Sequence, residues 1–375
     1  MNNMNLDADN SLTSEEQKLV DELVAQIRRA MGDTAQRFGT RVIRDGTQIL
    51  RGRRLRMEGF QERLYSRWAL PLDCYELCLY VAQGCGDYFN RNFHPGAGAE
   101  EDHQFETLIR LQAGAVRVAG EVYALLLAGF PSGAHARWRT LHEIAVTALF
   151  IAQEGKETAE RYVHHRFVKS YEDAVQYQKY AGKLNEKPFT EDEFQRIEAD
   201  CKAVLARYGR EFRDRYAWAV PALLRRDANL KGAKIGFEHL QRAVDVPHWT
   251  PYHRMASHAV HPSATFVRFN LGSREDIPVI LAGPSNADLA DPGQGAVLSL
   301  TKATAALLTF ESGSEIAQLN QRVGLSAMIT ALNALAEFAS REFIKVHKQL
   351  EKEIEAEKNN PPNISGRAPR TQRAT

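Results

Sequence analysis

The sequence predicts an all-α protein, a multi-helix bundle around a central antiparallel helical hairpin. Apolar residues recur at helical spacing over long stretches. A tight break, Pro131-Ser132-Gly133, separates the two central stretches. Strands do not alternate with helices, so nothing suggests a parallel sheet. At most we expect a small β-like excursion near residues 265–282.

The N-terminal region is predicted to be a helical, Arg-rich extension over residues 13–69. Thr13 and Glu16 have the spacing of a capping box, so a helix is expected to begin there. Gly32 is expected to end that helix, because glycine is a common stop signal. Four further glycines interrupt residues 35–67, where we predict short helices joined by loops. Residues 1–12 are polar and are expected to be flexible.

The main helical domain is predicted over residues 70–357, followed by a disordered tail over 358–375. The break at Pro131 is short, so its two flanking helices should form the hairpin. Thr250 before Pro251 predicts another helix start, and Pro262 predicts its end near His261. The remaining helices are expected at 72–93, 101–130, 134–153, 157–181, 190–217, 295–319 and 325–355, with short irregular helices over 218–248.

Composition excludes several classes of protein. Lys and Arg number 48 and Asp and Glu number 47, so the chain is neither globally basic nor acidic. No apolar stretch approaches the ~20 residues that span a bilayer, and the N-terminus lacks a signal-peptide core. The four cysteines do not form a disulfide pattern. Phosphate-loop, dinucleotide and zinc-protease motifs are absent. We therefore expect a cytoplasmic protein with no membrane association, no metal ligands and no cofactor.

Each helix of the hairpin carries a polar stripe. Arg139, His142 and Glu143 lie on one side of the second helix, and that side becomes apolar further along. Arg117 and Glu121 occupy a stripe on the first helix at a similar depth. The two R-x3-E pairs could form a structural ion network. Alternatively, the same groups could line a polar pocket in which His142 and the carboxylates perform acid–base chemistry.

A second candidate site lies on the predicted helix before Pro262. Arg254, Ser257, His258 and His261 cluster on one side of that helix, and Arg254 and His261 form an R-x6-H pattern. Such a pair suits metal-independent RNA cleavage, because histidine can transfer a proton at a ribose oxygen while arginine stabilises the phosphate charge. An exposed amphipathic face without chemistry is the alternative interpretation.

Two resemblances follow from these residues. Arg139-x3-Glu143 on a hairpin helix, and later Tyr252, Ser257 and His261-Pro262, resemble the mainly bacterial helical proteins of domain of unknown function 5677, roughly over residues 70–345. That resemblance implies functional positions at Arg139, Glu143, Tyr252, Ser257 and His261, and no agreed activity.

A looser similarity, through the R-x6-H pattern, is to HEPN ribonucleases. These all-α proteins carry an R-x4-6-H motif, work mostly as dimers and occur in toxin–antitoxin and antiphage defence systems. The similarity implies a homodimer. The sequence departs from the pattern, because Met255 follows Arg254 where HEPN proteins have a polar residue.

The segment 35–67 is the most basic part of the chain. It holds nine arginines against Asp45, Glu58 and Glu62, with Phe38 and Phe60 among them. Arginines can bind the phosphates of a nucleic-acid backbone and aromatic rings can stack on bases, so RNA is a candidate partner. A solvated helical surface is the alternative.

The leading hypothesis is a helical, metal-independent ribonuclease of a bacterial defence or toxin system. The alternative is a non-enzymatic ligand-binding or regulatory protein with a structural charge network, and a third hypothesis is hydrolysis of a small polar substrate in the hairpin pocket. The predicted catalytic residues are Arg254, His261 and His142. The predicted binding or orienting residues are Arg139, Glu143, Ser257, Tyr252, His258, Arg117 and Glu121.

Overall fold

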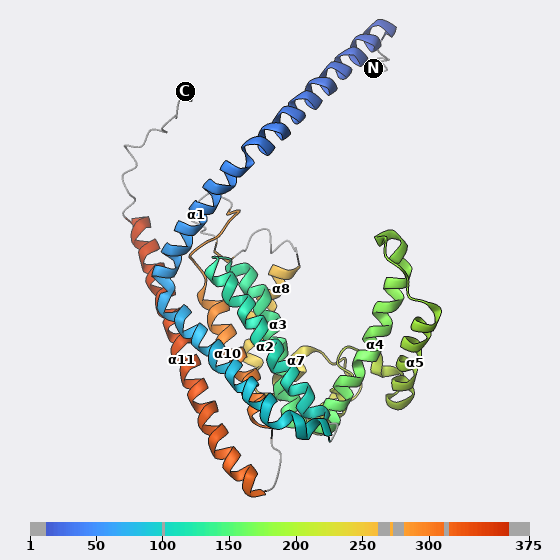
Figure 1. Cartoon of the computed structure of the whole chain (residues 1–375), viewed down its shortest axis with the longest axis vertical. Coiled ribbons are helices and arrows are strands. Elements are labelled where there is room, and N and C mark those ends of the chain that lie inside the picture. Colours follow the sequence, from blue (N-terminus) through green and yellow to red (C-terminus); the bar gives the residue numbers. More distant parts are fainter. Residues whose placement is uncertain (1–12, 100–101, 262–270, 273–280, 311–314, 360–375) are drawn as a thin grey trace, which may run out of the picture. The chain divides into compact units, whose positions relative to one another are not determined.

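The computed structural model describes residues 13–99, 102–261, 271–272, 281–310 and 315–359. Within these ranges all regular structure is helical, which confirms the predicted all-α class (Figure 1). The N-terminal 12 residues, most of the predicted β-like excursion and nearly all of the C-terminal tail lie outside the described residues. The described helices are α1 (Ser14–Ala99), α2 (His103–Leu127), α3 (Pro131–Glu154), α4 (Lys156–Tyr180), α5 (Glu191–Tyr208), α6 (Val220–Arg226), α7 (Phe237–Ala243), α8 (Thr250–Val260), α10 (Ala290–Leu308) and α11 (Glu315–Asn359).

The first helix, α1, is much longer than predicted. Thr13 does cap it: Thr13 Oγ1 accepts from the Glu16 N–H at 3.3 Å, and the Glu16 carboxylate accepts from the Thr13 N–H at 2.8 Å. The predicted end at Gly32 and the predicted loops in 35–67 are wrong, because α1 is one helix of 86 residues that passes through all of these positions. A glycine inside a helix costs only about 1 kcal/mol relative to alanine and keeps its backbone donor, so it weakens a helix without ending it.

The chain divides into two units between Arg63 and Leu64, inside α1. In the first unit, no described residue from Thr13 to Arg63 is buried. The second unit contains the rest of α1 and all the other described helices, and its core begins at Leu64. None of the described helices is both long enough and apolar enough to cross a membrane.

The predicted central hairpin is confirmed as α2 and α3. Asp102 caps α2 by accepting from the backbone N–H groups of Gln104 at 2.9 Å and Phe105 at 3.1 Å. The Gln104 amide donates to the Ile151 carbonyl at 3.3 Å, so the start of α2 lies beside the end of α3. Pro131 is the first residue of α3, where its missing N–H costs nothing. From there to Ala152 no residue of α3 is exposed.

Helix α10 closes the core by packing against α2, α3 and α11. Trp138 of α3 donates its indole N–H to Ser299 Oγ at 3.1 Å. A Cβ at Gly295 would lie 2.8 Å from Trp138 Nε1, so this position needs glycine for close helix approach. Gly293 has the same role against Phe343 of α11, whose ring would lie 2.6 Å from a Cβ.

Several helix boundaries differ from the prediction. Helix α5 ends at Tyr208, not near residue 217, because Gly209 follows with φ of +91°. The break between the last two helices falls before Glu315, and α11 continues through Gly324. Trp249, not Thr250, occupies the cap position of α8.

Candidate functional site

The polar stripe of α3 ends in a group of four charged or titratable side chains. Glu143 Oε1 lies 3.1 Å from Arg139 Nη2 and 3.1 Å from His253 Nε2, and Glu143 Oε2 lies 3.3 Å from Arg215 Nη2. Arg139 and Glu143 are one turn apart on α3, His253 comes from α8, and Arg215 comes from the segment after α5. We call Arg139, Glu143, Arg215 and His253 the Glu143 cluster.

The charges of the cluster keep Glu143 ionised. Burial by itself would raise the pKa of this carboxyl group. The hydrogen bond with His253 and the positive charges of Arg139 and Arg215 outweigh burial and lower the pKa below its ordinary value. Glu143 is therefore a carboxylate at neutral pH. One carboxylate among three basic groups is a poor metal site and a good anchor for a histidine.

A single nitrogen of His253 contacts two groups of opposite character. His253 Nε2 lies 3.1 Å from Glu143 Oε1, and Arg139 Nε lies 3.2 Å from the same nitrogen. A protonated Nε2 donates to the carboxylate, whereas an unprotonated Nε2 accepts from the guanidinium. His253 Nε2 therefore has a hydrogen-bond acceptor and a hydrogen-bond donor within contact distance.

The cluster borders a cavity. Glu143 and Arg215 line a space of about 280 Å³ together with Thr140, Tyr216 and Phe237. The side chains of Arg139 and Glu143 keep 22% and 25% of their surface exposed. The pairing around Glu143 is thus not sealed from solvent, which is the condition under which a polar stripe can bind a ligand.

His142, a predicted catalytic residue, lies behind this cluster in the core. It is 1% exposed, and burial lowers its pKa to about 3, so the ring is neutral. The Gln241 amide lies 3.0 Å from His142 Nε2 and accepts from the Thr250 hydroxyl at 3.2 Å. The ring stacks against Trp138 and Trp249. These contacts give His142 a packing and hydrogen-bonding role next to the cluster.

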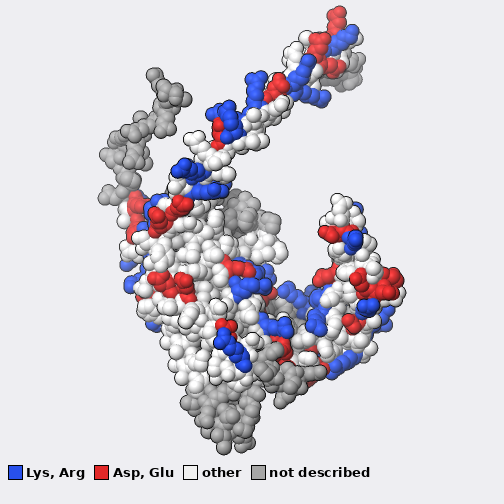
Figure 2. Space-filling view, viewed as in Figure 1, with Lys and Arg blue, Asp and Glu red and all other residues white. Residues whose placement is uncertain are grey.

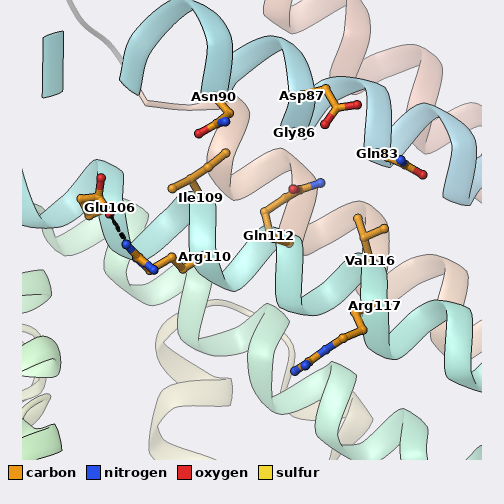
Figure 3. Close-up of a pocket in the computed structure, with 11 residues that line it drawn as sticks. Gln83, Gly86, Asp87, Asn90, Glu106, Ile109, Arg110, Gln112, Val116 and Arg117 are labelled. Atoms are coloured by element: carbon orange, nitrogen blue, oxygen red, sulfur yellow. Dashed lines mark hydrogen bonds and ion pairs between the residues drawn. The ribbon is translucent and has the colours of Figure 1, made fainter. Parts of the chain in front are cut away.

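The predicted partners on α2 are not brought into the cluster. Glu121 forms an ion pair with Arg137, on the other side of the hairpin turn. Arg117 is exposed and lines a separate cavity of about 540 Å³ between α1 and α2, and Gln83 and Asp87 of α1 are among its other lining residues (Figure 3).

The predicted residues of α8 are mostly on its outer side. Tyr252, Arg254 and His261 are exposed, and His258 is half-buried. Ser257 is also half-buried, and its hydroxyl donates to the His253 carbonyl at 3.0 Å. His261 comes eight residues after His253, about 12 Å further along the helix at 1.5 Å per residue.

His253 and Arg215 are the site residues that the sequence reasoning missed. His253 precedes Ala256 by three residues and Val260 by seven, so the helical spacing places it on the apolar side of α8. A histidine on an apolar helix face is predicted to be buried, and this could have marked His253 as a candidate. Arg215 falls within the predicted helix over residues 190–217, whereas α5 ends at Tyr208, so the predicted helix did not place Arg215 beside Glu143.

Eight of the nine arginines of segment 35–67 are exposed on the helix of the first unit, where blue side chains are prominent in Figure 2. Arg67 belongs to the second unit, where it is half-buried and forms an ion pair with Glu353. Arg41 and Arg44 lie 3.7 Å and 2.9 Å from Asp45. Arginines outnumber the acidic residues there, so this surface keeps a positive excess.

The chain is thus an all-α protein in which Arg139 and Glu143 of the central hairpin contact His253 of α8 at the edge of the core. Residues 105–277 match the model of a family of unknown function (DUF5677). The matched range contains the whole Glu143 cluster and α8, which agrees with the resemblance inferred from Arg139, Glu143 and α8. The similarity to HEPN ribonucleases is not shown. No curated protein and no solved structure gives a significant match.

Proposed function

We propose that the Glu143 cluster is an acid–base site for a phosphate-bearing substrate, and that this substrate is RNA, cleaved without a metal ion. The supporting observation is the position of His253 Nε2 between a carboxylate and a guanidinium at 3.1 Å and 3.2 Å. Glu143 and Arg215 of the same cluster line a cavity in which a ligand could contact them. Arginine has five N–H donors, so Arg139 and Arg215 keep donors for a phosphate beyond those that contact the cluster.

Each residue then has a chemical role. Neutral His253 takes the proton of the ribose 2′-hydroxyl as that oxygen bonds to phosphorus. The bond from phosphorus to the 5′ oxygen breaks, and the leaving oxygen takes a proton from water. Glu143 stabilises the imidazolium that forms, and the arginines stabilise the charge on the phosphate oxygens. This proposal moves the proton-transfer role from His261 to His253.

The exposed pair Arg254 and His261 is a second candidate for the same chemistry, and His142 is kept as a residue that supports His253. The resemblance to HEPN proteins implies a homodimer. In such a dimer, the Arg254–His261 pairs of the two copies would together form one site. RNA cleavage would also fit a role in a bacterial toxin or defence system.

Replacing His253 with asparagine is expected to slow RNA cleavage by about 100-fold or more, the usual range for loss of an acid–base group. Asparagine keeps a donor toward Glu143. His261→Ala is the matched variant on the same helix and should keep wild-type activity. The measurement is the rate of cleavage of labelled single-stranded RNA in excess chelator, with circular dichroism to verify folding of each variant.

The other outcomes are equally decisive. Loss of activity in His261→Ala alone would assign the chemistry to the Arg254–His261 pair. Equal cleavage by wild type and both variants would indicate a contaminant. No cleavage by folded wild-type protein would overturn the ribonuclease proposal and favour the non-enzymatic alternative, in which the Glu143 cluster is a structural or ligand-binding charge network.

We further propose that RNA contacts the Arg-rich helix. Replacing Arg37, Arg41 and Arg44 with glutamine should weaken RNA binding and lower the slope of log affinity against log salt by about 2, since each contact to single-stranded phosphate contributes about 0.7. The matched control replaces the same three residues with lysine, which keeps the charge. Filter binding of single-stranded RNA at several salt concentrations gives both slopes. An unchanged slope in the glutamine variant would exclude these arginines from the RNA contact.

A further inference from the structure

Three side chains that commonly bind metals meet where α2 packs on α4. His103 is the first residue of α2, and Glu160 and His164 lie one turn apart on α4. One ligand atom from each lies within 4.8 Å of those of the other two, and all three residues are half-buried. The rings of His103 and His164 are 6.0 Å apart between centroids.

We propose that His103, Glu160 and His164 form a zinc site with an open fourth position. Two imidazole nitrogens and one carboxylate oxygen are a ligand set that zinc takes in sites with three protein ligands. Zinc bonds of 2.0–2.1 Å place tetrahedral ligand atoms roughly 3.4 Å apart. Small side-chain rotations would therefore close the present spacing around an ion. The sequence reasoning predicted no metal ligand, because His103 lies far from the other two in the chain.

The surroundings of His164 suit a ligand. Its Nδ1 lies 2.8 Å from the Tyr208 hydroxyl, so a ring that donates from Nδ1 to this oxygen leaves its other nitrogen free to bind a metal. Hydrogen bonds of this kind orient metal-binding histidines in known sites.

Arg207 is a competitor for the proposed ion. Its Nη2 lies 2.8 Å from Glu160 Oε1, so a zinc ion would have to displace this guanidinium or use the second oxygen. The Arg207 side chain is 54% exposed, so it can turn into solvent without being left buried and unpaired. Removal of Arg207 should consequently strengthen zinc binding, a result that a purely structural ion pair would not give.

The proposed site lies at the edge of a large cavity. His103 lines a space of about 800 Å³ together with Thr107 and Tyr162. Thr107 follows His103 by one helical turn, and its buried hydroxyl has no hydrogen-bond partner among the described residues. An open zinc position here would be accessible to water or a small ligand, with Thr107 available as a hydrogen-bond partner for it.

The test is calorimetric titration of the tag-free, full-length, chelator-treated protein with zinc chloride. We expect one ion per chain. His103→Ala and Glu160→Gln should each weaken binding by about 100-fold, the upper end of what loss of a supporting group costs. Arg207→Gln should strengthen it several-fold. His248→Ala removes an exposed histidine outside the site and should leave binding unchanged.

Absence of stoichiometric binding by folded wild-type protein would overturn the proposal, and so would wild-type affinity in both His103→Ala and Glu160→Gln. Cobalt gives a second readout, because a tetrahedral site produces strong visible absorption that the same variants should lose. The RNA assay contains excess chelator, so failure of one proposal leaves the other unaffected.

Discussion

Lowering the pH from 7 to 5 is expected to destabilise the folded protein by about 4 kcal/mol through two buried histidines of α3. Burial lowers the pKa of His135 to about 4 and that of His142 to about 3. In the unfolded chain both titrate near 6.5. At pH 5 the unfolded chain therefore binds about one more proton at each histidine, which costs the folded state about 2 kcal/mol per residue.

The direction and the pH window follow from these values. The stability contributed by the neutral rings is complete above pH 6.5 and falls as the pH decreases, toward about 4 for His135 and about 3 for His142. Burial also lowers the pKa of His164 and His165, so they act in the same direction. Glu143, whose pKa is lowered, affects stability only below its ordinary range near 4.5. The interval from pH 7 to 5 thus reports the histidines.

The measurement is urea unfolding at pH 7, 6 and 5, followed by circular dichroism. His142→Gln keeps an amide that can bond with Gln241 and should remove about half of the pH dependence. His248→Gln, at an exposed position, should leave it unchanged. A pH dependence that stays as large as the wild type's in a double His135→Gln, His142→Gln variant would contradict the assignment to these rings.

Replacing Trp138 with alanine is expected to cost about 4 kcal/mol, within the range for large aromatic residues in protein cores. Trp138 is 1% exposed. Its ring centroid lies 5.2 Å, 5.4 Å and 5.8 Å from those of His135, His142 and Trp249. The substitution also leaves Ser299 without the indole donor. Both the lost contacts and the cavity left behind lower stability.

Two controls separate these contributions. Trp138→Phe keeps most of the ring and should cost less than half as much, while Ser299→Ala should cost about 1 kcal/mol, the usual value of one hydrogen bond. Phe338→Ala removes an aromatic side chain that is 40% exposed and should change stability little. Urea unfolding at pH 7 compares the four variants. A cost below 1 kcal/mol for Trp138→Ala would show that the interface between α3 and α10 is not well packed.

Most of the architecture follows from local patterns in the sequence. The capping box at Thr13 has a local signature, and the structure confirms it. The short turn of the hairpin was also predictable, but it falls at residues 128–130, and the predicted break at Pro131–Gly133 forms the first turn of α3. Glycine misled the prediction in α1, because a glycine with space around it lowers helix stability without breaking the hydrogen-bond ladder. Gly295 is the opposite case, because the residue that requires a glycine there is Trp138, which lies 157 positions earlier in the chain.

The site was predictable only where its residues share one helix. Arg139 and Glu143 are one turn apart and pair as expected. The stripe on α2 was expected to join them, but Glu121 pairs with Arg137 instead. His253 completes the cluster from α8, and the choice between it and His261 depends on how α8 packs against α3. Helical periodicity shows which side of α8 is apolar and will be buried, but it does not show which helix that side packs against.

The contact between α3 and α10 also has a consequence for synthesis. Trp138 and Ser299 are 161 residues apart, although their side chains share a hydrogen bond. At about 5–20 residues per second, the ribosome needs roughly 10–30 s to make the chain between them. The α2–α3 hairpin can form from local contacts early in that interval, but its tryptophan face has no α10 to cover it. This apolar face therefore stays uncovered until the ribosome has made α10.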